Sequence, residues 1–129
     1  MATGFPAVTG DVLSANMYNG LVSFTLNPQT GTTYTSVLND SYQVLVTMSN
    51  AAANTFKIPT NASVAHPIGT VITVLNKSAG VCTLSAVTSG TTTVLSAGAV
   101  AAAPTLAQYR SCAAIKIDTD IWYIVGAIG

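Results

Sequence analysis

Charge is the scarcest property of this sequence. Only 6% of its 129 residues are charged, whereas soluble domains ordinarily carry about 25%. Four Lys or Arg balance four Asp or Glu, so the formal net charge is +0. Binding to nucleic acid through phosphates needs clustered cations, and here Lys57, Lys77, Arg110 and Lys116 are scattered along the chain. The sequence therefore predicts no nucleic-acid partner.

Long apolar runs are also missing. A helix that spans a membrane needs about 18 continuous apolar residues, and the longest run of small apolar residues is only Ala97–Ala103. The segment Met1–Pro6 has neither the basic region nor the apolar stretch of a secretory signal. We therefore expect no membrane partner and assembly in a cytoplasm. In that compartment Cys82 and Cys112 are expected to be buried thiols, although a disulfide between them is an alternative.

Side chains for catalysis or metal binding are few. Acid–base and nucleophilic catalysis need an activated side chain, and zinc needs three or four Cys, His or carboxylate ligands. The sole histidine, His66, precedes Pro67 in a turn, where an exposed or hydrogen-bonded role is favoured over a catalytic one. Asp118 and Asp120 lie in one turn and are expected to cap it. We expect no enzyme activity, no catalytic residue, no metal and no cofactor.

What the sequence does contain is a repeated pattern of short apolar strands. The length fits one domain with one core, and apolar residues alternate with Thr, Ser and Asn between turn residues. The turns predict hairpins between successive strands, so the expected fold class is all-β, an antiparallel β-sandwich or barrel-like domain with Thr70–Leu75 as a central strand. The expected strands are Leu21–Leu26, Thr33–Leu38, Gln43–Met48, Thr55–Ile58, Thr70–Leu75, Val81–Val87, Thr91–Leu95, Tyr109–Ile117 and Ile121–Val125.

The last expected strand is apolar on both faces. Trp122 and Ile124 would lie on one face, and Ile121, Tyr123 and Val125 on the other. A small single sandwich seldom buries both faces of a strand, so the pattern indicates an oligomer. Sugar or peptide binding by these aromatic side chains is disfavoured, because they occupy strands and not loop tips. The expected subunit interface consists of Tyr109, Trp122, Tyr123 and Ile124.

The first twenty residues differ from the rest. Gly4, Pro6 and Gly10 interrupt this segment, so we divide the chain into an N-terminal attachment arm, residues 1–20, and a β-sandwich domain, residues 21–129. An alternative is that the arm lies on its own domain. The candidate anchors of the arm are Phe5, Val8, Leu13, Met17 and Tyr18.

Several segments together resemble a known class of proteins. Gly10–Asn19, which reads Gly-Asp-Val-Leu-Ser-Ala-Asn-Met-Tyr-Asn, resembles an opening common in tailed-bacteriophage virion proteins. Thr30–Thr35, Ile58–Pro59, Pro67–Thr70 and Ile115–Gly126 are similar in type and order to a β-domain of phage tail-fibre, tail-tip and head-decoration proteins. The resemblance implies a virion component, commonly trimeric, that is attached to a shell or a fibre.

The expected function follows from this resemblance. A β-domain with only a short arm fits a capsid decoration or cement protein, which docks on the head shell and stabilises it. Its expected partners are itself, as a homotrimer, and the major capsid protein or other virion proteins, and its expected location is the virion. The alternative is a tail-fibre or tail-tip module that binds a host receptor or glycan through Asn61–Pro67 or Gly98–Pro104. A glycan-cleaving enzyme is disfavoured because carboxylates are scarce.

Overall fold

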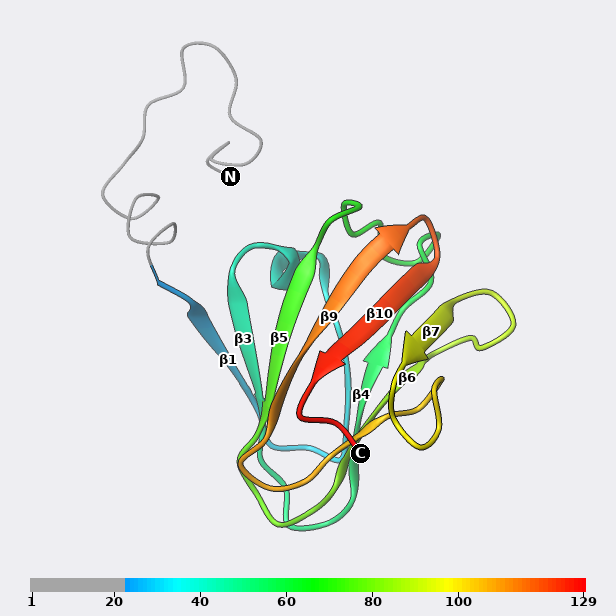
Figure 1. The fold of residues 1–129 in the computed structure, drawn as a ribbon. Coiled ribbons are helices and arrows are strands. Elements are labelled where there is room, and N and C mark those ends of the chain that lie inside the picture. Colours follow the sequence, from blue (N-terminus) through cyan, green and yellow to red (C-terminus); the bar gives the residue numbers. More distant parts are fainter. Residues whose placement is uncertain (1–22) are drawn as a thin grey trace.

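The computed structural model describes residues 23–129 (Figure 1). Strands hold 46% of these residues and helix 4%, in two sheets with no closed barrel. The all-β prediction is therefore confirmed. No helix in the described part of the chain is long and apolar enough to cross a membrane. The expected arm, residues 1–20, with its anchors Phe5, Val8, Leu13, Met17 and Tyr18, lies outside the described residues.

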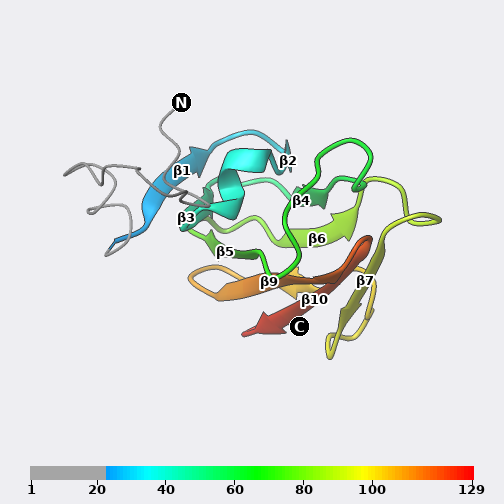
Figure 2. The same cartoon turned by 90° about the horizontal axis from the view of Figure 1, so that it is seen from above.

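The chain passes back and forth between the two sheets. In order, the elements are β1 (Thr25–Gln29), β2 (Thr33–Thr35), the 3-10 turn η1 (Leu38–Ser41), β3 (Val44–Met48), β4 (Asn54–Ile58), β5 (Val71–Asn76), β6 (Cys82–Ala86), β7 (Thr93–Ser96), β8 (Thr105–Leu106), β9 (Ser111–Asp118) and β10 (Ile121–Gly126). One sheet has the order β1-β3-β5-β9-β10-β7 and the other β2-β4-β6-β8 (Figure 2). From β1 to β9, each strand therefore lies in the opposite sheet to the one before it.

This alternation makes most strand pairs parallel. Of the eight pairs in the described residues, five are parallel: β1/β3, β3/β5, β2/β4, β4/β6 and β10/β7. The expected antiparallel arrangement is wrong for these pairs, and so are the hairpins expected from Thr33–Leu38 to Gln43–Met48 and from Thr70–Leu75 through Val81–Val87 to Thr91–Leu95. Turn residues show where a chain bends, but a bend that carries it to the other sheet uses the same residues.

The end of the chain follows the expectation. β9 and β10 pair antiparallel across the turn that contains Asp118 and Asp120, and the Oδ1 atom of Asp118 accepts a hydrogen bond from the Thr119 amide at 2.7 Å. The expected hairpin and its Asp118 cap are therefore confirmed. The cap expected of Asp120 is wrong, because its side chain accepts from Asn61 and Thr92, outside the turn. β5 lies third in the six-stranded sheet, with β3 and β9 as neighbours, so the prediction of a central strand there is also confirmed.

One apolar core fills the space between the sheets. Its buried side chains come from β3 to β10, so both sheets contribute to it: Val44, Val46, Met48, Phe56, Ile58, Ile72, Val74, Cys82, Leu84, Val94, Leu106, Cys112, Ala114, Trp122 and Ile124. Cys82 and Cys112 are free thiols within it, as expected. Burial raises the pKa of Cys82 to about 11. Burial, with the neighbouring Cys82, raises that of Cys112 to about 12. Both thiols therefore stay protonated at neutral pH.

Candidate functional site

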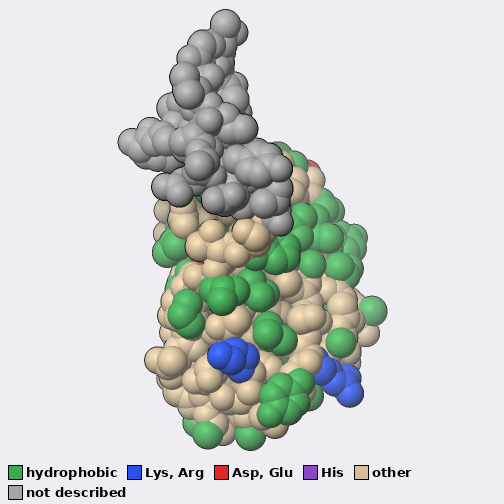
Figure 3. All heavy atoms as spheres, turned by 90° about the vertical axis from the view of Figure 1, so that its left-hand side faces the viewer, with side chains coloured by type: hydrophobic (Ala, Val, Ile, Leu, Met, Phe, Trp, Pro, Cys, Tyr) green, Lys and Arg blue, Asp and Glu red, His purple; other side chains and the backbone are tan. Residues whose placement is uncertain are grey.

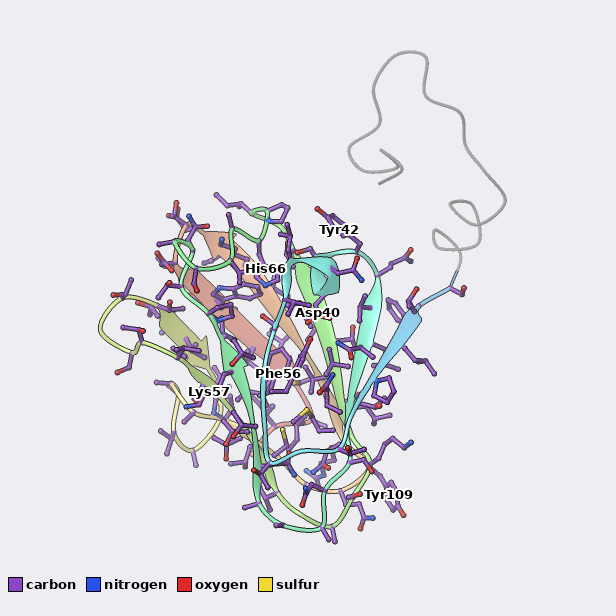
Figure 4. All side chains as sticks on the ribbon, turned by 180° about the vertical axis from the view of Figure 1, so that it is seen from behind. Asp40, Tyr42, Phe56, Lys57, His66 and Tyr109 are labelled. Atoms are coloured by element: carbon purple, nitrogen blue, oxygen red, sulfur yellow. The ribbon has the colours of Figure 1, made fainter. Side chains whose placement is uncertain are left out.

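The residues of the expected subunit interface lie in three different environments. Trp122 and Ile124 are each 1% exposed and pack in the core of their own chain. Tyr123, between them on β10, lies on the outer face of the six-stranded sheet and is 42% exposed. Tyr109 was expected to begin a strand, Tyr109–Ile117, but it lies in the turn before β9, so the expectation that it occupies a strand and not a loop is wrong. It is 77% exposed, at the end of the molecule opposite His66 (Figure 4). Within this chain β10 is therefore covered on one face only, and of these residues only Tyr123 and Tyr109 are accessible to a partner.

The outer face of the six-stranded sheet is mostly apolar, with Thr47, Thr73 and Ser111 as hydroxyl side chains on the same side. The pairing registers align Leu26, Leu45, Thr73, Ala113 and Val125 in one row across β1, β3, β5, β9 and β10. A second row aligns Val71, Ile115, Tyr123 and Leu95 across β5, β9, β10 and β7. None of these positions carries a charged side chain. We call these two rows, together with Leu75 on β5, the apolar face.

The outer face of the four-stranded sheet has the opposite character. Thr33, Thr55, Thr83 and Thr105 form one row across β2, β4, β6 and β8, and Thr35, Lys57 and Ser85 form the next. The Nζ atom of Lys57 donates to the Ser85 hydroxyl at 3.2 Å. Hydroxyl groups at a surface exchange hydrogen bonds with water, so this hydroxyl face is suited to solvent. The two sheets therefore present one face suited to a partner and one suited to water.

A groove of about 560 Å³ lies at one edge of the apolar face, between β7 and β10. Its walls are apolar apart from one serine: Leu95, Ser96, Ala97, Tyr123, Ile124, Val125, Gly126 and Ile128. Leu95, Tyr123 and Val125 belong both to this groove and to the apolar face. The groove has room for an apolar side chain from a partner that covers the face.

His66 is held inside the molecule between two serines. It is 2% exposed, and its Nε2 and Nδ1 atoms lie 3.0 Å from the Ser36 hydroxyl and 2.5 Å from the Ser41 hydroxyl. Its ring also meets the Trp122 ring edge-on, with centroids 5.4 Å apart. Burial and the nearby Lys116 charge lower the pKa of His66 to about 4, while Asp40 opposes this shift. A hydrogen-bonded His66 was expected, but its burial in the interior was not.

Asp40, next to this histidine cluster, is also buried and is hydrogen-bonded through both carboxylate oxygens. It is 1% exposed. Its Oδ1 accepts from the Asn27 amide at 3.0 Å, and its Oδ2 accepts from the Tyr34 hydroxyl at 2.6 Å and the Val37 amide at 3.0 Å. Burial and the bond to Asp40 raise the pKa of Tyr34 above its usual value. The carboxylate therefore ties β1, β2 and η1 together, and three donors engage its two oxygens.

Lys116 fixes the loop that follows β4. It is 2% exposed, and its Nζ atom donates to the Asn61 side-chain oxygen at 2.6 Å and to the His66 carbonyl at 2.7 Å. Burial lowers the pKa of Lys116, and Asp120 opposes that shift. Asp120 in turn accepts from the Asn61 amide at 2.8 Å and the Thr92 hydroxyl at 3.1 Å. The polar groups of this end of the molecule are therefore engaged with one another.

These contacts leave few free groups for chemistry. Among residues 23–129, no cluster of three or more His, Cys, Asp or Glu side chains could hold a metal ion. The sequence had indicated the two-faced pattern for Ile121–Val125 only, but Leu45 and Leu75 lie on the same apolar face. The sequence signal that could have found Leu45 and Leu75 is a second set of apolar residues in the same strands, at the positions that alternate with the core-facing ones.

Comparisons with protein-family models, with curated proteins and with solved structures find no match to this chain.

Proposed function

We propose that this chain is a structural subunit of a tailed-bacteriophage virion, a capsid decoration or cement protein that works by packing against other chains. The observation that carries the proposal is the contrast between the apolar face and the hydroxyl face. Monomeric proteins rarely expose a large contiguous apolar patch unless it is a contact site. The resemblance of the sequence to phage virion proteins supports the choice of particle.

The occupant we propose for the apolar face is a second copy of the chain, in a homotrimer. Burying apolar surface contributes about 25 cal/mol per Å², and a face without charges can be buried without leaving a charge unpaired. A shared face of this kind needs no partner of complementary charge, which matches a chain with four cations and four anions in all. The hydroxyl face of each subunit then stays in water.

A catalytic role has less support from the same geometry. Both ring nitrogens of His66 are bonded to serines, and the carboxylate of Asp40 is occupied by three donors. We therefore propose assembly, and not turnover, as the activity of the chain. Release of reducing sugar from host polysaccharide would contradict this.

The proposal predicts that one charge on the apolar face breaks the oligomer. In Tyr123→Lys an ammonium group enters the buried contact, and its desolvation should weaken self-association at least tenfold. Thr83→Lys is the matched control, because it places the same side chain on the hydroxyl face. Sedimentation and light scattering should find trimers for the unmodified chain and for Thr83→Lys, and monomers for Tyr123→Lys.

Two results would overturn this assignment. One is a monomer for the unmodified chain at about 100 μM, since trimers held by a surface of this kind should persist there. The other is a Thr83→Lys chain that dissociates while Tyr123→Lys remains trimeric. Circular dichroism of each variant shows whether a loss of trimer is separate from a loss of fold.

The attachment arm carries a separate prediction. Deletion of residues 1–20 should abolish binding to capsids and leave a folded oligomer, because the arm and the apolar face are proposed to serve different contacts. Co-sedimentation with capsids that lack the protein measures the first result, and light scattering the second. Retained capsid binding would remove the arm from the proposal. Density at the tail in images of the particle would favour the alternative tail-fibre or tail-tip module.

A further inference from the structure

Tyr109 is held in a backbone conformation that its side chain disfavours. Its φ of 64° lies in the left-handed region, which costs a residue with a bulky side chain about 1–2 kcal/mol. Glycine would avoid this cost. The ring gains little from the fold in return, because at 77% exposure it is the most exposed large hydrophobic side chain in the described residues. A strained backbone that brings no gain in packing indicates that the Tyr109 side chain serves to contact a ligand and not to stabilise the fold.

A buried asparagine organises the surroundings of Tyr109. Asn76, at the end of β5, is completely buried. Its Nδ2 donates to the carbonyls of Gly80 at 2.8 Å and Leu106 at 2.9 Å. The carbonyl of Asn76 accepts from the Tyr109 amide at 2.7 Å. The loop after β5 and the segment before β9 are therefore fixed side by side, and the ring of Tyr109 is presented on a rigid base.

Two cations lie on these same segments. Lys77 directly follows Asn76, and Arg110 directly follows Tyr109; both are exposed. The side-chain amide of Gln108 bridges the segments by donating to the Lys77 carbonyl at 3.4 Å. Figure 3 shows Lys and Arg side chains in the lower part of the molecule, with hydrophobic side chains near them. An exposed aromatic ring is thus combined with two positive charges.

The side-chain carboxylates of the described residues lie elsewhere. Asp118 and Asp120 sit at the opposite end of β9 from Arg110, about 25 Å away at the rise of a strand. Asp40 is buried beside His66, at the end of the molecule opposite Tyr109 (Figure 4). Among residues 23–129, no Asp side chain therefore lies beside Lys77 or Arg110, and their positive charges can attract an anion.

We propose that Lys77, Tyr109 and Arg110 bind an acidic saccharide, one whose sugar ring carries a carboxylate. The apolar side of the sugar ring packs on the tyrosine ring, and the guanidinium of Arg110 receives the carboxylate through paired hydrogen bonds while Lys77 adds a point charge. Two cations are few for nucleic acid, whose binding depends on many neutralised phosphates. This role goes beyond assembly and does not rest on the proposed function.

The test uses the full chain and alginate oligosaccharides, which carry a carboxylate on every ring. Titration calorimetry should detect binding that weakens as salt is raised, and neutral dextran oligosaccharides should not bind. Tyr109→Gly should weaken alginate binding at least tenfold while the melting temperature stays equal or rises, because glycine removes the strained φ. Loss of affinity without loss of stability separates a ligand contact from a structural role.

The chain offers a matched control at each position. Apart from Tyr109, Gln43 is the one non-glycine residue with a positive φ in the described part of the chain. Its φ is 52°, and its side chain is exposed. Gln43→Gly should change stability in the same direction and leave alginate binding unaltered. Likewise Arg110→Gln should weaken binding at least fivefold, whereas Lys57→Gln, which removes a cation from the hydroxyl face, should not.

Three outcomes would overturn the proposal. The first is no binding of alginate by the unmodified chain at millimolar concentration. The second is equal affinity for Tyr109→Gly and the unmodified chain. The third is binding of a single-stranded oligonucleotide in preference to alginate, which would assign the site to a different ligand class. Light scattering measures the trimer independently of alginate binding. A failure to bind alginate would therefore leave the proposed trimer contact at the apolar face untouched.

Discussion

Replacing Trp122 by alanine should lower the free energy of unfolding by about 3–5 kcal/mol, the range for removing a large aromatic side chain from a core. The side chain is 1% exposed on β10 and is the largest one fully buried in the described residues. Its ring also supports His66, whose centroid is 5.4 Å away. The loss is a large part of the 5–15 kcal/mol that stabilises an ordinary domain.

The adjacent residue provides the control. Tyr123→Ala also removes an aromatic side chain from the same strand, but from the side that is 42% exposed, so the unfolding of the monomer should change by less than about 1 kcal/mol. Urea unfolding should be followed by circular dichroism for both variants. Trp122 is the only tryptophan, so Trp122→Ala has no tryptophan fluorescence to report unfolding. If Trp122→Ala does not fold, Trp122→Phe gives the same comparison with a smaller cost. Equal costs for the two positions would contradict the assignment of the two faces of β10.

The stability of the folded chain should fall as the pH is lowered from about 6.5 to about 4. His66 has an ordinary pKa of 6.5 and a folded-state pKa lowered to about 4, first by burial and then by the Lys116 charge. Between these values the unfolded chain binds the proton and the folded chain does not. Stability from the neutral ring is therefore complete above pH 6.5 and is lost on acidification, by up to about 3 kcal/mol below pH 4.

Urea unfolding at a series of pH values measures this loss. The free energy of unfolding should be flat from pH 7 to 8 and decline below 6.5, while His66→Gln should show a much smaller decline over the same range. The two serines do not oppose protonation, since each hydroxyl oxygen can accept a hydrogen bond from a ring N–H. A histidine that titrates near 6.5 by NMR in the folded chain would contradict the prediction.

Local features of the sequence predicted local features of the fold. Alternation with period two placed strands near their observed bounds in Gln43–Met48 and Thr70–Leu75. The turn at Asp118 and Asp120 predicted a hairpin correctly, because the two strands that it joins are also partners in the sheet. Where successive strands lie in different sheets, as β5 and β6 do, the same reasoning gave the wrong pairing.

The candidate sites were predictable to different degrees. The apolar side of Ile121–Val125 was visible in the sequence, but its extension over Leu45 and Leu75 depends on the parallel registers of β3 and β5. The cluster at Tyr109 was not visible, because it depends on a left-handed φ and on Asn76, 33 residues earlier, bonding the segments together.

By itself, the sequence determined a β-rich chain with two buried thiols, a terminal hairpin and very little charge to bind nucleic acid. These properties follow from composition and from side chains that alternate along a strand, which are set by neighbours in the chain. Only the tertiary structure decided which strands pair, which outer face is apolar, and that His66, Asp40 and Lys116 are buried. The physical reason is that strand pairing and burial depend on contacts between residues far apart in sequence, and a turn residue specifies a bend without specifying the partner beyond it.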